Sequence, residues 1–327
     1  MRILSGVQPS GELHLGNYFG AIQQHLALQD QGDAFYFIAD YHSLTTLHDA
    51  ARLRQLSREV AATYLALGLD PARATFFRQS DVPEVHELTW MLECVTGMGL
   101  LQRATSYKDK LARGLKPNVG LFTYPALMAA DILIYGSNLV PVGADQVQHV
   151  EIAQDMAQSF NHAFGVEVLL RPEYRLSKTP KVPGVDGQKM SKSYGNTIPI
   201  FAKGKALKRA VNAIVTDSKD PKTEALDPET CNAFAILALF APEDELQELA
   251  RRYREDRTFP GYGVTKKGIV EQIDAHFGPA RERFEQLMQP QSELEDVLRQ
   301  GAQRARAVAR ETVERCREAT GLGPRLT

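Results

Sequence analysis

Hydrophobic and polar positions over roughly the first 170 residues predict strands that alternate with amphipathic helices. Short runs rich in β-branched and aromatic residues are typical of buried strands, and between them apolar residues recur at spacings of three and four, as on a helix with one buried face. This alternation favours a parallel sheet wrapped by helices and joined by right-handed crossovers. The expected strands are 2–7, 34–40, 74–79 and 139–142, and the expected helices are 17–29, 49–67, 83–96, 120–134 and 145–160.

Residues 171–197 interrupt this pattern. The segment contains three prolines, three glycines and several lysines, and it is too polar and too broken for a buried element, so we expect a long loop. Beyond it the helical spacing continues without strand-like runs. The expected helices of this part are 206–214, 231–240, 243–254, 264–277 and 293–318.

A chain of 327 residues corresponds to about two domains at roughly 150 residues per domain. The change of pattern near residue 200 predicts where they divide. We expect an α/β fold with a doubly wound parallel sheet over residues 1–200, followed by an all-α domain over residues 201–327.

Composition narrows the class of protein. Hydrophobic residues make up 43% of the chain and charged residues 24%, which is ordinary for a soluble globular protein and excludes disordered and fibrous classes. No apolar run is long enough for a membrane span, and the N-terminus lacks the features of a secretory signal, so we expect a cytoplasmic protein without membrane contact. Cys94, Cys231 and Cys316 form no CxxC pair and the histidines lack metal-ligand spacing, so we expect no disulfide framework and no metal ligand.

The charge balance leaves only local surfaces for a nucleic acid. Lys and Arg number 38 against 40 Asp and Glu, a net charge of −2, which does not predict such a partner for the whole molecule. Two segments, 203–209 and 304–317, are rich in Lys and Arg. Each can be a phosphate-contacting surface or a solvated helix face, and i,i+4 pairs such as Arg310–Glu314 favour the second interpretation for 304–317.

Candidate chemistry begins directly after the first expected strand, in the segment Gln8–Tyr18. In an open α/β sheet, ligands bind beyond the carboxyl ends of the strands, where helix N-termini present N–H groups to anions. His14 and Asn17 can donate hydrogen bonds to phosphate or ribose oxygens, and Gly16 has no Cβ to keep a base away from the backbone. The segment predicts a nucleotide site, and an ordinary glycine-rich turn is the alternative.

The second element is Lys189–Ser193, KMSKS, inside the long expected loop. Two ammonium groups on a hinged loop can close over a triphosphate and neutralise the charge that develops on a leaving pyrophosphate. Alone the pentapeptide is a weak signal, but the combination with the His-x-Gly-Asn turn indicates nucleotide chemistry.

These two motifs resemble the signatures of the class I aminoacyl-tRNA synthetases, with Asn17 in place of the second histidine of the HIGH-type sequence. The stretches SGVQPSGELHLGNYFGAI, TYPALMAADILIYGSNLVPVGADQVQHVE and KVPGVDGQKMSKSYGN are similar to the bacterial, tryptophan-specific branch over nearly the whole chain. The resemblance implies a Rossmann-like catalytic domain and a helical anticodon-binding domain. It also implies a homodimeric ligase that activates L-tryptophan with ATP and Mg²⁺ and transfers it to the 3′ end of tRNA(Trp).

The resemblance also implies roles for individual residues. It assigns the principal catalytic donors to His14, Asn17, Lys189 and Lys192, which would act by positioning and charge stabilisation without a side-chain nucleophile. Ala144 departs from a glutamate that is common in the family at that position. The implied ATP contacts are Gln8, Pro9, Ser10, Gly16, Asn17, Gly143, Ala144, Asp145, Val182, Lys189, Met190, Ser191, Lys192 and Ser193.

A tryptophan pocket is expected on the helix 120–134. Tyr124, Met128 and Asp131 are spaced by four and three, so they project from one face of that helix. Tryptophan offers a flat apolar bicycle and one N–H donor, which suits a pocket with one carboxylate, Asp131, as acceptor. Met128, Val140 and Val142 are its expected walls, and the alternative is that they are simply core. The resemblance adds Tyr124 and Gln146 as groups that hold the ammonium and carboxylate of the amino acid, and it places Leu4 where some relatives have phenylalanine.

Three other functions stay open at this point. A tyrosyl-type synthetase shares the fold and both motifs. A non-catalytic paralogue that binds tryptophan or RNA would be expected to lose the lysines or the His-x-Gly turn, and both are intact here. A small-molecule adenylating ligase would not need the all-α domain. The apolar run 88–101 is a candidate for the symmetric interface of a dimer.

Overall fold

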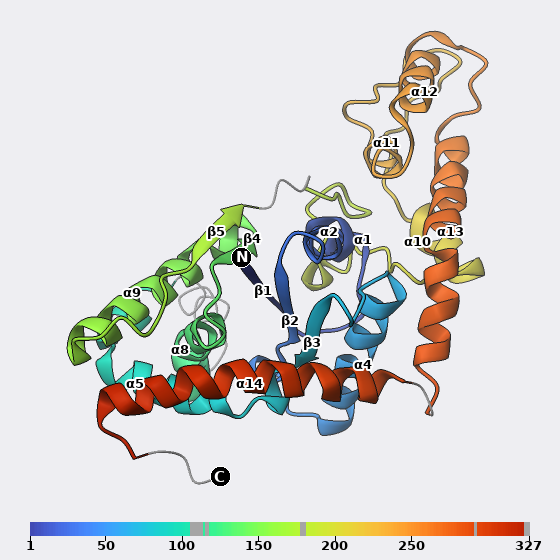
Figure 1. Ribbon diagram of the computed structural model, residues 1–327. Coiled ribbons are helices and arrows are strands. Elements are labelled where there is room, and N and C mark those ends of the chain that lie inside the picture. The colour runs from blue at the N-terminus through green and yellow to red at the C-terminus, as the bar shows by residue number, and fades with distance from the viewer. Residues whose placement is uncertain (105–113, 115–117, 177–180, 291–292, 324–327) are drawn as a thin grey trace. The chain divides into compact units, whose positions relative to one another are not determined.

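A parallel five-stranded sheet forms the centre of the first half of the chain (Figure 1). The computed structural model describes residues 1–104, 114, 118–176, 181–290 and 293–323, and the side chain of Asp145 lies outside this description. The strands follow the order β3-β2-β1-β4-β5, and every neighbouring pair is parallel. Their bounds are β1 Arg2–Val7, β2 Asp33–Ile38, β3 Ala74–Arg78, β4 Leu139–Val142 and β5 Glu173–Leu176.

The strand order confirms the doubly wound topology. From β1 the chain adds β2 and β3 on one side and then crosses to add β4 and β5 on the other. The direction of winding therefore reverses between β1 and β4, where Ile3 pairs with Leu139. In sheets of this kind the crevice at the carboxyl ends of these two strands is the usual ligand site.

Strand β5 corrects the expectation of a loop over 171–197. It pairs with β4 from Leu139↔Glu173 to Val142↔Leu176, and all four of its residues are exposed. A strand at a sheet edge can be held by backbone hydrogen bonds without a buried face, so it carries no hydrophobic alternation for sequence reasoning to find.

The helices lie close to the expected ranges, with two differences. The expected helix 17–29 is broken into α1 (Leu15–Asn17), a π-helical turn η1 (Tyr18–Ile22) and α2 (Gln23–Leu28). The expected helix 264–277 is longer, because α13 continues through Pro279. The remaining elements are α3 Asp40–Ser43, α4 Ala50–Ala66, η2 Gln79–Asp81, α5 Glu84–Val95, α6 Met98–Gln102, α8 Val119–Leu133, η3 Ala144–Gln146, α9 Val147–Phe164, η4 Lys192–Tyr194, α10 Gly204–Asn212, α11 Asn232–Leu237, α12 Glu243–Glu255, α13 Tyr262–Leu287 and α14 Leu294–Thr320.

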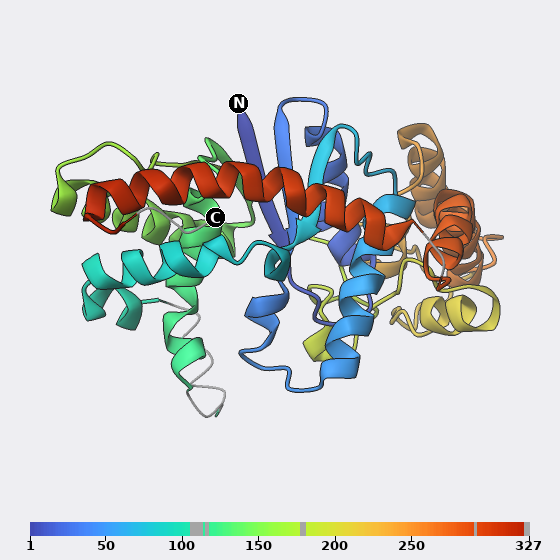
Figure 2. The ribbon, with the colours of Figure 1, turned by 60° about the horizontal axis from the view of Figure 1, so that its bottom comes forward.

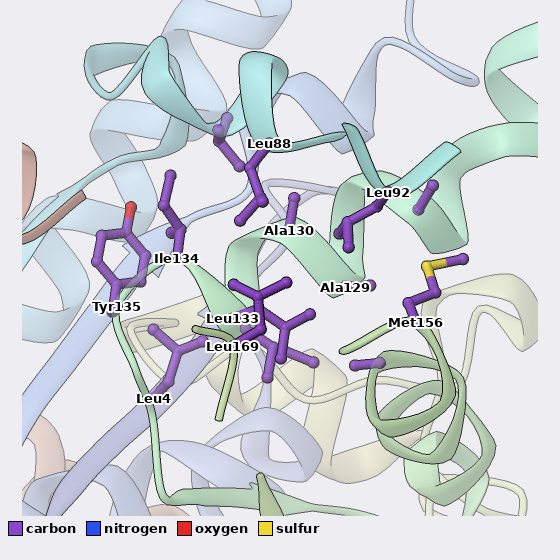
Figure 3. Packing of buried hydrophobic residues seen from close by; sticks show 14 of the residues in the cluster. Leu4, Leu88, Leu92, Ala129, Ala130, Leu133, Ile134, Tyr135, Met156 and Leu169 are labelled. Atoms are coloured by element: carbon purple, nitrogen blue, oxygen red, sulfur yellow. The ribbon is translucent and has the colours of Figure 1, made fainter. Parts of the chain in front are cut away.

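The described chain forms two compact units. The first comprises residues 1–10, 25–177 and 287–327, and the second comprises 11–24 and 178–286. In the first unit α8 packs against both α5 and α9, and its Ala129 and Ala130 allow close approach (Figure 3). Leu88 and Leu92 from α5 and Met156 from α9 fill this core and are almost without solvent contact.

Helix α14 belongs to the first unit, so the units do not follow the expected division at residue 200. It runs beside β3 and α5 (Figure 2). At Gly301 the contact is so close that a Cβ would lie 1.8 Å from the carbonyl oxygen of Phe76. The apolar face of α14, which includes Ala305 and Val313, is buried in this core, and sequence position alone does not show which unit supplies that burial.

The second unit gathers residues 11–24 with α10–α13. Tyr18 contacts Phe277 edge to face, and its hydroxyl lies 2.9 Å from Nε2 of His276 on α13. Phe19 contacts Phe240 in the same way. These contacts explain why the turn after β1 groups with helices that lie more than two hundred residues later.

The burial of the run 88–101 and the length and apolar character of the helices bear on two expectations from the sequence. Leu88, Leu92 and Leu101 of the run 88–101 lie inside the core of their own unit, which argues against the whole run as an interface. Trp90 and Met98 are its exposed large apolar side chains. Among the described residues, no helix combines the length and the apolar character needed to cross a membrane.

Candidate active site

Two of the predicted ATP segments follow the neighbouring strands β1 and β4, at the carboxyl edge of the sheet. Gln8–Ser10 comes directly after β1, and the N–H of Ser10 donates to the carbonyl of Gln8 at 2.9 Å. Gly143 comes directly after β4 and starts the turn η3, which leads into α9. Gly143 and Ala144 are exposed, whereas the side chain of Asp145 lies outside the described part of the structure. Both segments therefore stand where the winding of the sheet reverses.

Asp131, the predicted indole acceptor, is buried and held by two donors. Its side chain is 2% exposed. The Gln79 amide donates to both carboxylate oxygens at 2.7 and 3.0 Å, and Nε2 of His42 lies 3.0 Å from Oδ2. Burial raises the pKa of Asp131, and the bonds to His42 and Gln79 oppose that shift. These donors fix the orientation of the carboxylate.

Sequence reasoning missed His42 and Gln79 as site residues. His42 lies on α3, which follows β2, and Gln79 opens η2, which follows β3. Both sit just past the carboxyl ends of parallel strands, and that position was the signal that could have found them.

Tyr124 lies on the same helix as Asp131 and has its own partner. Its hydroxyl is 2.8 Å from Nε2 of His149, and burial raises the pKa of Tyr124 to about 12. The ring of His42 meets Tyr124 edge to face, with centroids 6.3 Å apart. The structure therefore brings Asp131 and Tyr124 together through His42. His149 is a buried histidine whose Nε2 is hydrogen-bonded to Tyr124.

The predicted walls of the pocket are buried. Val140, Val142 and Leu4 are at most 8% exposed, and Met128 packs partly buried against the same core. Gln146 closes η3 and is half-buried.

A cavity of about 510 Å³ adjoins this region in the first unit. Its lining includes Tyr124, Tyr41, His86 and Trp90. Of the predicted tryptophan residues it shares Tyr124, whereas Asp131 does not line it.

The His14 turn lies in the second unit. His14 is 5% exposed, its backbone N–H donates to Oδ1 of Asn17 at 3.1 Å, and its Nδ1 is buried without a hydrogen-bond partner in the described chain. Burial, and secondarily the charge of Lys192, lowers the pKa of His14 to about 4. The imidazole is therefore neutral near pH 7.

KMSKS lies on a short hairpin, residues 182–196, which we call the KMSKS hairpin. The N–H of Met190 donates to the carbonyl of Val182 at 2.9 Å, and both side chains are 4% exposed. Ser191 and Ser193 lie beside each other, with their hydroxyls 2.9 Å apart.

The structure brings the two motifs into contact within the second unit. The N–H of Gly16 points to the sulfur of Met190 at 3.3 Å, and Nζ of Lys192 donates to the carbonyl of Gly11 at 2.8 Å. A Cβ on Gly16 would lie 3.0 Å from the His14 ring and 3.3 Å from Cβ of Met190. This close approach explains the glycine. The sequence could not predict this contact, because Gly16 and Met190 are 174 residues apart.

The two basic segments differ in the structure. On α10, Lys205, Lys208 and Arg209 are exposed. On α14, the arginines bind the first unit itself: Arg306 and Arg310 bond the fully buried carboxylate of Glu84 at 2.8 and 3.0 Å. The interpretation of 304–317 as a solvated face is wrong for Arg306, which is partly buried against Glu84 of α5, whereas Arg310 bonds the same carboxylate and is still exposed.

Comparison with known proteins identifies the class. Residues 1–278 match the family described as tRNA synthetases class I (W and Y), and the chain belongs to that family. It is 49% identical to tryptophan–tRNA ligase of Rhodopirellula baltica over 322 residues, which span 98% of this chain and 100% of that protein. It is 50% identical to the tryptophan–tRNA ligase of Fusobacterium nucleatum, with 98% of each chain covered.

A solved structure is similar over the same length. Tryptophanyl-tRNA synthetase from Campylobacter jejuni, complexed with ADP and tryptophan, superposes with a TM-score of 0.93 at 48% identity and covers 98% of this chain and 100% of that one. These relatives confirm the expected class of enzyme and its Rossmann-like fold.

Proposed function

We propose that this protein is a tryptophan–tRNA ligase that forms tryptophanyl-adenylate from L-tryptophan and ATP and transfers the amino acid to the 3′ end of tRNA(Trp). The observation that carries this function is the similarity to tryptophan–tRNA ligases, which are 49% and 50% identical to this chain over 98% of its length. The contact between the His14 turn and the KMSKS hairpin supports it, because both motifs of the activation chemistry are intact and adjacent.

Tryptophan recognition is assigned to the first unit. We propose that Asp131 accepts the indole N–H, that Met128, Val140 and Val142 enclose the ring, and that Tyr124 and Gln146 hold the ammonium and carboxylate ends. A carboxylate held by Gln79 and His42 is oriented before the ligand arrives, so little ordering is left for binding.

ATP is assigned to the residues at the sheet edge and in the two motifs. We propose that the ATP contacts are Gln8, Pro9, Ser10, Gly143, Ala144 and Asp145, which follow β1 and β4, and Gly16, Asn17, Val182, Met190, Ser191 and Ser193 of the two motif segments. The tryptophan carboxylate attacks the α-phosphorus, a new C–O–P link forms, and the bond to pyrophosphate breaks. Lys189 and Lys192 would neutralise the leaving charge, while the neutral His14 and Asn17 would donate hydrogen bonds.

Magnesium would arrive bound to the phosphates of ATP. Among the described residues no group of three or more His, Cys, Asp or Glu side chains is placed to hold a metal. Mg²⁺ commonly keeps its waters and binds substrate phosphates, and no protein ligand is proposed.

The helical part is assigned to tRNA. We propose that residues after 201 reach the anticodon, with α14 excepted because it packs on the first unit, and that the exposed lysines of α10 contact phosphates. We also propose that the protein acts in the cytoplasm as a homodimer, since the family resemblance implies that state.

Pyrophosphate exchange into ATP with each of the twenty amino acids tests the function. Exchange that depends on tryptophan is expected. Tyrosine-dependent exchange would instead support the tyrosyl-type alternative, and no exchange with any amino acid would support a non-catalytic paralogue.

A further inference from the structure

The KMSKS hairpin is organised by one buried side chain, Asn196, which is 2% exposed. Its Oδ1 accepts the N–H of Ser191 at 2.7 Å, and its Nδ2 donates to Oδ1 of Asp186 at 2.7 Å and to the carbonyl of Lys189 at 3.2 Å. The bonds to Lys189 and Ser191 lie on either side of Met190. The position of Asn196 therefore fixes the backbone that carries the signature lysines.

A second asparagine reaches the hairpin from outside it. Asn232 is the first residue of α11, and its Nδ2 donates to two successive carbonyls of the hairpin, Gly184 at 2.8 Å and Val185 at 3.2 Å. An amide nitrogen has two N–H donors, so both are used. Its Oδ1 is buried and has no hydrogen-bond partner in the described chain. An unpaired buried acceptor costs stability, so the contribution of this side chain lies in its two donated bonds.

The two asparagines meet at Gly184. A Cβ on Gly184 would lie 2.3 Å from Nδ2 of Asn196, so the Gly184 backbone packs directly on that amide, while its carbonyl accepts from Asn232. Gly184 therefore links α11, through Asn232, to Asn196 and to the backbone around Met190, which contacts Gly16.

We propose that Asn232 is a positioning residue for ATP: it holds the KMSKS hairpin in the geometry in which Lys189 and Lys192 meet the phosphates. This inference rests on the proposed function and deepens it. Asn232 belongs to neither signature motif, and it ties the hairpin to the helical part of the second unit. We expect the effect of Asn232 to fall on ATP, because the hairpin that it bonds carries residues assigned to ATP and none assigned to tryptophan.

The test compares isosteric variants of Asn232 in pyrophosphate exchange with the full-length protein. Asn232→Leu removes both donors, and Asn232→Asp also places a negative charge against two carbonyl oxygens. Loss of two hydrogen bonds predicts about a tenfold fall in kcat/KM for ATP, with KM for tryptophan unchanged. Asn232→Ser keeps a shorter donor and is expected to recover part of the activity. Ala235→Asp, at an exposed position of the same helix, controls for the added charge.

Hydrogen exchange supplies a readout that separates positioning from general stability. In Asn232→Leu the amides of Met190 and Ser191 are expected to exchange faster, while amides of β1 keep their protection. Combining Asn232→Leu with Asn196→Ala should cost less than the sum of the single effects, because both act through one hairpin.

The inference would be overturned if the effects of Asn232→Leu and Asn196→Ala on kcat/KM for ATP were additive. It would also be overturned if a folded Asn232→Leu protein kept both its kinetic constants for ATP and the hydrogen-exchange rates of the Met190 and Ser191 amides. If the unmodified protein shows no tryptophan-dependent exchange, the proposed function fails. The amide exchange at Met190 and Ser191 then still decides whether Asn232 holds the hairpin.

Discussion

Asp131 has almost no contact with water, and its oxygens already accept hydrogen bonds from His42 and Gln79. A carboxylate has about four lone-pair sites, so an indole N–H can be added to these partners. Phenylalanine has no such donor, and a site built around a hydrogen bond rejects an analogue that lacks it much more strongly than a merely apolar pocket does.

Asp131→Ala is therefore expected to reduce the activation of tryptophan by about 1.5–3 kcal/mol, the range for a hydrogen bond to a charged group. The gap between tryptophan and phenylalanine should narrow. The measurement is kcat/KM for both amino acids in both proteins, with Asp155→Ala, an exposed carboxylate of the same unit, as control. An unchanged ratio would place indole recognition elsewhere.

Lys192 donates to the carbonyl of Gly11 at 2.8 Å. If it stabilises charge that appears only as pyrophosphate leaves, Lys192→Ala should lower kcat for activation by about 10²–10³-fold, by analogy with the loss of one preorganised donor. Binding of tryptophan should hardly change. The matched control is Lys181→Ala, at an exposed lysine directly before the KMSKS hairpin. A variant that keeps kcat but loses affinity for ATP would show that Lys192 binds the ground state.

His25 predicts how stability responds to acid. It is fully buried beside the hydroxyl of Tyr64, at 2.9 Å, and burial lowers its pKa to about 4 from the ordinary 6.5. Between these values the unfolded chain binds a proton that the folded protein does not, so stability decreases as pH falls from 6.5 towards 4.

The slope from this one group is at most about 1.4 kcal/mol per pH unit. Denaturant unfolding at several pH values should show a shallower slope for His25→Gln in that window. His48→Gln, at an exposed histidine, is the matched control substitution. Equal slopes in the His25 variant and the unmodified protein would contradict this account.

At the scale of elements, the packing of α14 on β3 has a glycine at its tightest point. A Cβ at Gly301 would lie 1.8 Å from a backbone oxygen of β3, which cannot move without disturbing the sheet. Gly301→Ala should destabilise the protein by at least about 1–3 kcal/mol, the usual cost of overpacking.

Gly268 offers the contrast within another long helix, α13. Its added Cβ would lie 3.8 Å from Leu237, an ordinary contact, so Gly268→Ala should stabilise by about 0.5–1 kcal/mol. Thermal unfolding of both variants compares them. A Gly301→Ala protein as stable as the unmodified one would mean that α14 is free to move away from β3.

At the scale of the whole molecule, the net charge of −2 does not predict RNA binding. The exposed lysines of α10 form a local basic surface, whereas Arg306 and Arg310 of the second predicted segment are paired with Glu84. Replacing Lys205 and Lys208 by alanine should weaken aminoacylation, lower its salt dependence by roughly one phosphate contact per lysine, and spare tRNA-independent activation. Arg251→Ala, at an exposed arginine paired with Glu248, controls for loss of surface charge. An unaltered salt dependence would assign the α10 lysines to a solvated face.

The sequence by itself determined the features that are local in the chain. Period and turn chemistry predicted β1 and β4 at their observed bounds and helices near the observed ones in the second half, because these depend on neighbouring residues. The alternation of strands and helices was enough to predict the class of a doubly wound sheet. The spacing of Tyr124 and Asp131 on one helix face was determined in the same way, and the two signature motifs were sufficient for the family.

Tertiary structure decided everything that joins distant segments. The exposed strand β5 is held by its neighbour rather than by a buried face, α14 returns to the first sheet, and its arginines find Glu84 across the chain. His42 and Gln79 become partners of Asp131 only when β2 and β3 end at the same edge of the sheet. Asn232 reaches the KMSKS hairpin only when α11 packs beside it. Such contacts depend on which surfaces meet in three dimensions, and no local pattern in a single sequence records that choice.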